Sequence, residues 1–303
     1  MMKKTNYIIF IITICILLVG CENKHRTYLV PVQEYTGKEY LAKDKEQWDY
    51  VEEHKEIFEE YAIKWFKEKY QLDVKVNFTY PHIETETVIS TVEWIEDSDL
   101  KMCIVMGVDK TKHEVMGVNE TVMQVDYTIM AYLTHRMYEK EFYKLEKFLK
   151  EFATKYDLLG VNDEYLKNTG GFVAYNSTYY VMGSSSTDYE EILQMFIEDK
   201  NVSMKKLRKA YEKKKKELEE ELQKELIYID VNVRLYSKTN EINEELFQIL
   251  EKDFLAQEGF PDVNYVFTLC ENGINVEYGK AKEIDYPEYP SATGYIRIDG
   301  EYR

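Results

Sequence analysis

Residues 45–78, KEQWDYVEEHKEIFEEYAIKWFKEKYQLDVKVNF, contain a helical pattern that changes into a strand pattern. From 45 to 70 the apolar residues recur at steps of three, four and seven, which predicts one amphipathic helix. Asp44 is suitable as its N-cap. Between Val74 and Phe78, apolar and polar residues alternate, which predicts a strand with one buried face.

The rest of the chain shows runs of strand pattern and runs of helical pattern. Strands are predicted at 87–95, 101–108, 172–182, 227–236, 263–270, 274–278 and 294–299, and helices at 120–138, 140–156, 187–199, 204–225 and 241–257. Glu271-Asn272-Gly273 predicts a hairpin turn between two of these strands, 263–270 and 274–278. Regular strand–helix–strand alternation is missing. We therefore expect an α+β fold with helices packed on antiparallel meanders.

The passage from helix to strand has a counterpart later in the chain. Asp73-Val74-x-x-x-Phe78-Thr79 recurs as Asp262-Val263-x-x-x-Phe267-Thr268, and both copies follow a helical pattern. One interpretation is that the fold contains two related helix-plus-meander halves. The other is that any amphipathic helix joined to a strand produces this likeness, and the sequence leaves both open.

The first 21 residues, MMKKTNYIIFIITICILLVGC, have the features of an export signal. Lys3 and Lys4 precede an apolar run, 7–20, whose length as a helix is about 21 Å, against about 30 Å for a membrane core. Leu18-Val19-Gly20-Cys21 resembles a bacterial lipobox. We therefore expect cleavage before Cys21 and acylation of this residue on its sulfur (S-diacylglycerol) and on its new amino group. The alternative is an uncleaved short anchor.

Two acyl chains on one residue hold a protein stably on a membrane. The expected location is therefore the extracytoplasmic face of the cell membrane, and the expected partners are the membrane itself and the lipoprotein-processing enzymes. The expected organisation is a signal peptide (1–20), a lipidated cysteine and tether (21–40), a first α+β lobe (41–200), a charged helix (201–226) and a second α+β lobe (227–303).

The charge of the chain argues against nucleic acid as a partner. The formal charge is −17, and it becomes −19 once residues 1–20 are removed, because they contain two lysines and no acids. Binding to phosphate groups requires clustered Lys and Arg. We expect such an acidic body to be held off an anionic membrane surface.

No motif in the sequence predicts catalysis, a metal or a cofactor. The five histidines are scattered singly without metal-ligand spacing, and we interpret lone histidines as surface or capping residues. Ser203-Met204-Lys205-Lys206 fits the SxxK motif of penicillin-recognising enzymes, but the partner motifs are absent and Ser203 is explained as an N-cap. Cys103 and Cys270 fall in predicted strands, and we favour buried thiols over a disulfide. Cys21 is therefore the single predicted site residue.

The predicted helix at 204–225 has an unusual charge order. Its basic residues precede its acidic residues, which opposes the helix dipole, and its apolar stripe is thin. We interpret it as a solvated lever between lobes, and the alternative is a helix that recruits an outside partner.

Several short stretches resemble a known family. They are Val32-Gln33-x-Tyr35-Thr36-Gly37, Phe66-Lys67-Glu68-Lys69-Tyr70 before Val74-Lys75-Val76, Glu141-Phe142-x-Lys144-Leu145 and Asn168-x-Gly170-Gly171. Together they resemble an uncharacterised lipoprotein family, a domain of unknown function, from low-GC Gram-positive bacteria. The chain departs from that pattern at Thr178, where a proline is expected. The resemblance implies the anchor and the location, and it carries no activity.

From the anchor and the missing catalytic motifs we expect a non-enzymatic binding protein of the cell envelope, with a protein or glycan partner that the sequence does not identify. One alternative is an envelope hydrolase whose site is assembled from dispersed carboxylates. A further alternative is a substrate-binding lipoprotein of a transporter, which requires two α/β lobes around a hinge.

Overall fold

The structure is a computed structural model that describes residues 29–38, 45–82, 87–119, 125–171, 174–184, 189–222, 229–239, 244–275, 280–281 and 292–297. The helices are α2 (Lys45–Glu53), α3 (Lys55–Tyr70), α4 (Val125–Met137), α5 (Glu139–Lys155), α6 (Asp163–Thr169), α7 (Glu190–Glu198), α8 (Met204–Leu222) and α9 (Glu244–Leu255). The strands are β1 (Leu29–Val30), β2 (Val74–Pro81), β3 (Thr87–Trp94), β4 (Lys101–Asp109), β5 (Glu114–Val118), β6 (Leu158–Leu159), β7 (Ala174–Asn176), β8 (Tyr180–Ser184), β9 (Ile229–Ser237), β10 (Asn264–Cys270), β11 (Ile274–Asn275), β12 (Lys280–Ala281) and β13 (Ala292–Arg297).

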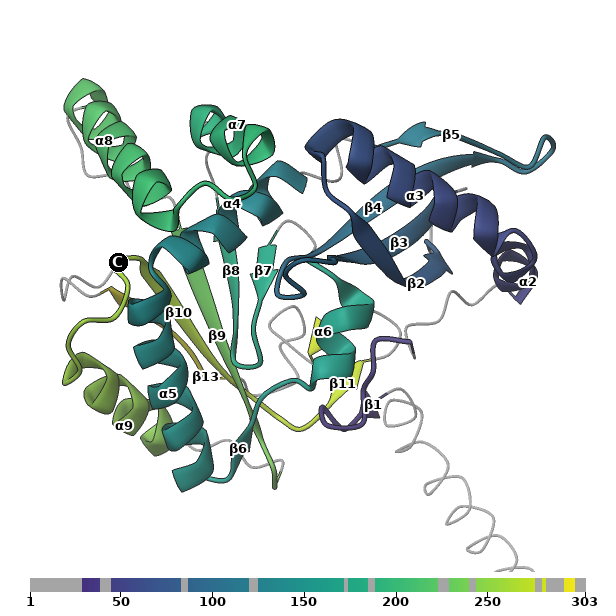
Figure 1. The fold of residues 1–303 in the computed structure, drawn as a ribbon. Coiled ribbons are helices and arrows are strands. Elements are labelled where there is room, and N and C mark those ends of the chain that lie inside the picture. The colour runs from purple at the N-terminus through teal and green to yellow at the C-terminus, as the bar shows by residue number, and fades with distance from the viewer. Residues whose placement is uncertain are drawn as a thin grey trace, which may run out of the picture.

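The first sheet is an antiparallel meander in the order β2-β3-β4-β5, with α3 packed on it (Figure 1). Side chains on both faces of β4 are buried, as the pattern at 101–108 predicts. Met102 and Ile104 belong to the main core, whereas Cys103 and Val105 belong to a smaller cluster on the other face. Helix and meander follow one another as expected from residues 45–78.

The second sheet has the order β13-β10-β9-β8-β7, and β6 also pairs with β9. Most of its pairs are antiparallel, but β9 and β10 are parallel, with α9 between them in the chain. The strands β7 and β8 come from before α8, whereas β9, β10 and β13 come from after it. The two lobes expected at 41–200 and 227–303 therefore share this sheet. The architecture is α+β, which confirms the predicted fold class.

The strand β10 does not form the predicted hairpin with the segment that follows it. Both edges of β10 are already occupied, one by β9 and the other by β13. After Cys270 the chain therefore leaves this sheet, and β11 pairs with β1 and β12 in a separate small sheet. The surroundings of β10 also differ from those of β2, which is an edge strand, so the two similar segments occupy different positions in the fold.

Two further elements differ from the prediction. The helix expected over 45–70 is interrupted at His54, whose ring stacks on Tyr50 at 4.4 Å and on His113 at 4.5 Å between centroids. The strand expected over 172–182 is a hairpin, β7 and β8. Asp44 lies outside the described residues. Ser203 caps α8 as predicted, because its Oγ accepts a hydrogen bond from the N–H of Lys206 at 3.3 Å.

Residues 29–38, which were expected in the tether, are packed into the folded body. Val32 and Tyr35 are fully buried. The side chain of Asn162, which caps α6, donates to the carbonyl oxygen of Tyr35 at 2.9 Å. Asn168 donates in the same way to the carbonyl oxygen of Thr36 at 2.7 Å. Two of the stretches that carry the family resemblance therefore dock against each other.

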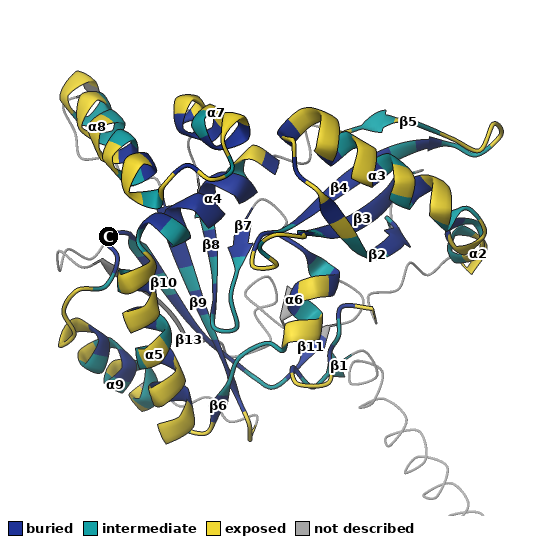
Figure 2. Ribbon diagram, viewed as in Figure 1, coloured by how far each residue is buried: buried dark blue, intermediate teal, exposed yellow. Residues whose placement is uncertain are grey.

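Helix α4 is the centre of the molecule. Ten of its residues are buried, and it contacts β4, β7, β8, α5, α7 and α8 (Figure 2). A helix that is buried on all sides shows no amphipathic stripe. The two sheets are therefore connected by a helix whose polar residues are also in the interior.

Helix α8 extends away from the body, and most of its length is exposed (Figure 2). Leu207 and Tyr211 are its buried residues. Lys213 pairs with Glu217 at 3.3 Å, one of three Lys–Glu pairs spaced four residues apart on this helix. Within the described residues, no helix is both long enough and apolar enough to cross a membrane.

Candidate functional site

Helices α4 and α5 meet at a corner at Tyr138, whose backbone (φ −114°, ψ 30°) separates the two helices. Because side chains three or four residues apart on a helix share a face, the residues near this corner divide between two cavities. Tyr138 and Phe142 line one cavity, whereas His135, Glu139 and Glu146 line a second one.

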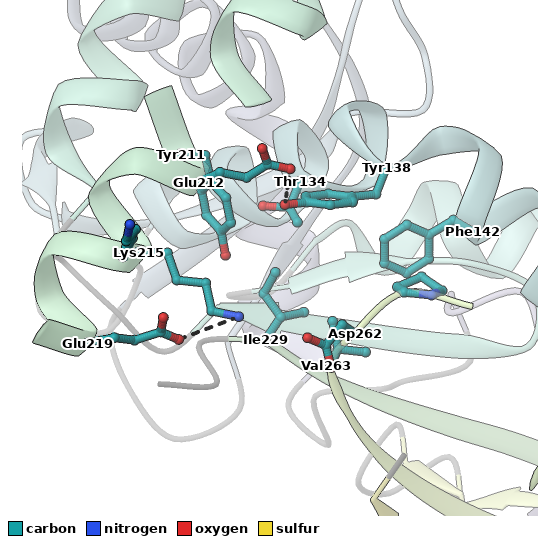
Figure 3. A pocket seen from close by; sticks show the side chains of 12 residues that line it. Thr134, Tyr138, Phe142, Tyr211, Glu212, Lys215, Glu219, Ile229, Asp262 and Val263 are labelled. Atoms are coloured by element: carbon teal, nitrogen blue, oxygen red, sulfur yellow. Dashed lines mark hydrogen bonds and ion pairs between the residues drawn. The ribbon is translucent and has the colours of Figure 1, made fainter. Parts of the chain in front are cut away.

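The first cavity, here called the α8 cavity, has a volume of about 300 Å³ and lies between the corner, α8 and the beginnings of β9 and β10 (Figure 3). Six of its twelve lining residues are aliphatic or aromatic. Lys215 pairs with Glu219 at 3.7 Å, and the Tyr138 hydroxyl donates to Glu212 at 3.5 Å. These four side chains pair with each other, and Lys216 and Asp262 are the other charged residues of the lining.

The second cavity, here called the acidic cavity, has a volume of about 330 Å³ and lies between the corner, the beginning of α6 and the turn from β7 to β8. It contains four carboxylates and two cations. These charged residues are Asp99, Lys101, Arg136, Glu139, Glu146 and Asp163. The lining therefore carries a net negative charge.

Arg136 is compensated by acids of the protein itself. It forms ion pairs with Asp97, with Glu139 at 3.1 Å and with Asp99 at 4.0 Å. The Tyr132 hydroxyl donates to Asp97 at 2.7 Å. Burial alone would raise the pKa of Asp97. The hydrogen bonds from Tyr132, Asp99 and Arg136, with the charge of Arg136, outweigh burial and lower this pKa. Arg136 and Asp97 thus form a stable ion pair at neutral pH.

Glu146 is held in place by two hydroxyl groups. Ser177 donates to its Oε1 at 3.1 Å and Tyr180 donates to the same oxygen at 3.0 Å. The nearest basic side chain is His135, whose Nε2 lies 3.9 Å from Oε1. In the part of the chain that the structure describes, neither Glu146 nor Asp163 has a Lys or Arg partner within 4.0 Å.

His135 is buried in the wall of the acidic cavity, with 7% of its surface exposed. Its ring stacks on Tyr175, with centroids 4.4 Å apart, and contacts Phe142 at 4.9 Å. Neither ring nitrogen has a hydrogen-bond partner among the described residues. Burial, with the positive charge of Arg136, lowers the pKa of His135 to about 4 against the opposing effect of Asp97. The imidazole is therefore neutral at pH 7.

The single residue that the sequence predicts as a site, Cys21, lies outside the described residues. Cys103 and Cys270 are buried thiols, as favoured from the sequence. The described residues contain no group of three or more His, Cys, Asp or Glu side chains that could hold a metal ion.

The interpretation of the histidines as surface or capping residues is wrong for His135. A sequence signal for this site is weak, because Glu146 reads as an ordinary polar position of an amphipathic helix. Ser177 and Tyr180 come from a hairpin more than 30 residues away. The one hint in the sequence is that the apolar residues of 125–137 do not form a single amphipathic stripe, which is typical of a largely buried helix.

Comparison with known proteins gives a family and a solved structure. Residues 22–292 match the sequence profile of a family described as "Protein of unknown function (DUF1672)". The crystal structure of a DUF1672 family protein from Staphylococcus aureus is similar in fold, with a TM-score of 0.67 at 17% identity. The match covers 89% of this chain and 98% of that chain. No curated protein matches the chain.

Proposed function

The chain belongs to the DUF1672 family of uncharacterised proteins, and on that premise we propose that it is a lipid-anchored binding protein of the cell envelope. In this proposal an acylated Cys21 holds the protein on the extracytoplasmic face of the membrane. The folded body binds a polar ligand in the acidic cavity and catalyses no reaction on it.

The observation that carries the binding role is the acidic cavity itself. Ligand sites are concave, and a few well-placed polar groups in them fix the orientation of the ligand. The cavity of about 330 Å³ is within the usual range of such sites. Tyr175 lies in β7, and Tyr143 and Glu146 lie in α5, so both rings and the fixed carboxylate come from regular elements.

The hydrolase alternative is less well supported by the same residues. An acid catalyst among paired carboxylates requires a raised pKa. The two described carboxyl groups whose pKa is shifted, Asp97 and Asp109, have lowered values. The Ser177 hydroxyl donates to Glu146 and not to His135. Ser177 and His135 therefore do not form the nucleophile–base pair of a serine hydrolase.

Two features support the lipid anchor: the leader sequence, residues 1–20, and the short distance along the chain between Cys21 and the folded body. The lipobox ends at Cys21, and the family profile matches from residue 22. Cys21 precedes β1 by eight residues, which reach at most about 27 Å when extended. The body is therefore within that distance of the membrane surface in this proposal, and its negative charge orients it away from anionic lipid.

Replacing Cys21 with serine is expected to abolish lipidation in the native host. The wild-type protein should appear in the membrane fraction with the mass of residues 21–303 plus acyl groups, whereas the Cys21→Ser variant should keep its leader and carry no lipid. The matched control is Cys15→Ser, which changes a thiol of the same leader but leaves the lipobox intact. Mass spectrometry that detects an intact leader and an unmodified Cys21 in the wild type would contradict the anchor.

Filling the acidic cavity is expected to abolish ligand binding. The full chain in detergent can be screened by nuclear magnetic resonance against envelope glycans, short peptides and small polar metabolites. We expect saturable binding without product formation. Glu139→Trp places an indole at the cavity rim and should remove the binding, whereas Glu151→Trp, on the same helix and outside the cavity, should retain it. Turnover of any bound compound would show that the protein is an enzyme.

A further inference from the structure

We propose that the acidic cavity recognises the ammonium group of a small cationic ligand, with Glu146 as its counterion and Tyr143 as an aromatic contact at the mouth. This inference rests on the proposed binding function and names the ligand class that the cavity selects.

The first argument is the charge of Glu146. Arg136 forms its ion pairs with Asp97, Asp99 and Glu139, and Lys101 donates to the carbonyl oxygen of Ser98 at 2.8 Å. No Lys or Arg side chain of the described residues lies within 4.0 Å of the Glu146 carboxylate. A half-buried negative charge without a counterion favours a cation, because the attraction is stronger there than in water.

The second argument is the geometry of the Glu146 carboxylate. Its Oε1 accepts both hydroxyl hydrogen bonds, from Ser177 and Tyr180. Its Oε2 accepts none from the described residues, although each carboxylate oxygen has two lone pairs. With 38% of the side chain exposed, the carboxylate is accessible from the cavity. One oxygen thus fixes the orientation while the other can accept a charge-assisted hydrogen bond from an ammonium group.

The third argument is His135, an independent sign of a polar ligand. It is more than nine-tenths buried in the cavity wall, with its Nε2 directed at Glu146 over a distance too long for a hydrogen bond. Burial keeps the ring neutral at pH 7, so His135 does not compensate the charge of Glu146. Both ring nitrogens are buried without a hydrogen-bond partner among the described residues, and a bound polar group or an ordered water at the wall would satisfy them.

The cavity also discriminates between kinds of cation. A divalent metal requires several carboxylate or imidazole ligands that converge, and no such group occurs in the described residues. An organic ammonium requires one carboxylate and benefits from an aromatic face. Tyr143 lines the cavity with 67% of its surface exposed, which leaves its ring available to a ligand. The volume suits a ligand at the small end of the usual range.

Isothermal titration of the full chain in detergent with butane-1,4-diamine, butane-1,4-diol and succinate tests this inference at pH 7. The three compounds have the same chain length and differ in charge. We expect saturable binding of the diamine and no measurable binding of the diol or of succinate. The Glu146→Gln variant should bind the diamine at least ten-fold more weakly, because the amide keeps the shape and removes the charge.

The matched control is Glu151→Gln, the same change on an exposed residue of α5 whose ion-pair partner is Lys147 at 3.9 Å. It should bind the diamine like the wild type. If Glu146→Gln does not fold, as judged by circular dichroism, the exposed Tyr143→Ala variant decides, with an expected loss of several-fold in affinity.

Two results would overturn the ammonium class. They are equal binding of the diol and the diamine, or unchanged diamine affinity in both Glu146→Gln and Tyr143→Ala. The broader proposal is judged separately. A neutral glycan or peptide whose binding is lost in Glu139→Trp would leave the binding function intact while rejecting the ammonium ligand.

Discussion

Replacing Gly171 with alanine is expected to lower the free energy of unfolding by about 3 kcal/mol, because the new methyl group has no space. A Cβ at this position would lie within 3.0 Å of the carbonyl oxygens of Lys101 and Ala174 and 2.6 Å from Cγ2 of Thr128. Two of these three atoms belong to the backbone and cannot rotate away. The backbone of Gly171 itself is fixed, since its N–H donates to the Lys101 carbonyl at 3.1 Å.

The comparison for this variant is Gly183→Ala, in β8. A Cβ at Gly183 meets no atom of the described residues within 4 Å, so the stability of this variant should change little. Urea denaturation followed by circular dichroism measures both variants, and the difference between their midpoints gives the cost of the close approach. Equal stability of the two variants would show that the contact between the 170–171 loop and β4 is not tightly packed in solution.

Replacing His135 with phenylalanine is expected to make the protein less sensitive to acid. An unfolded histidine has a pKa of about 6.5, whereas burial lowers the pKa of His135 to about 4 in the folded chain. Between these values the unfolded chain binds a proton that the native chain does not bind, so this group lowers stability as the pH falls. At pH 4.5 the loss amounts to about 2 to 3 kcal/mol, and it is absent above pH 6.5.

Phenylalanine retains the ring contacts with Tyr175 and Phe142 and removes the titration. Urea denaturation at pH 7 and pH 4.5 measures how much stability each protein loses on acidification. The wild type should lose about 2 to 3 kcal/mol more than the variant. The carboxylates near His135 are the same in both proteins, so their contribution largely cancels in the comparison. Parallel stability curves would mean that His135 binds its proton in the folded protein at an ordinary pH.

Much of the secondary structure followed from periodicity. The strands at 101–108 and 227–236 and the helices at 140–156 and 241–257 occur within a few residues of their predicted bounds. The wrong predictions share a cause. Glu271-Asn272-Gly273 has the local chemistry of a hairpin, but both edges of the preceding strand are occupied by β9 and β13. Local turn propensity carries no information about which strands from distant parts of the chain will pair with β10.

The break at His54 has the same origin. Nothing in the helical pattern of 45–70 marks it, and the His54 ring meets His113, a residue of the turn that follows β4. Likewise, ten residues of α4 are buried, so its buried polar side chains, His135 among them, cannot be recognised from an amphipathic stripe.

The amino-acid sequence alone was sufficient for the α+β class, for most helices and strands and for the resemblance to an uncharacterised family, because spacing and short motifs are local properties. It also motivates the acylation of Cys21, which stays a proposal. The tertiary structure alone decided that His135, Glu146 and Ser177 meet in one acidic cavity and that Tyr180 donates to Glu146 from behind its wall. Whether a charge has a counterion depends on which residues surround it in space, and those neighbours come from elements whose packing no local pattern specifies.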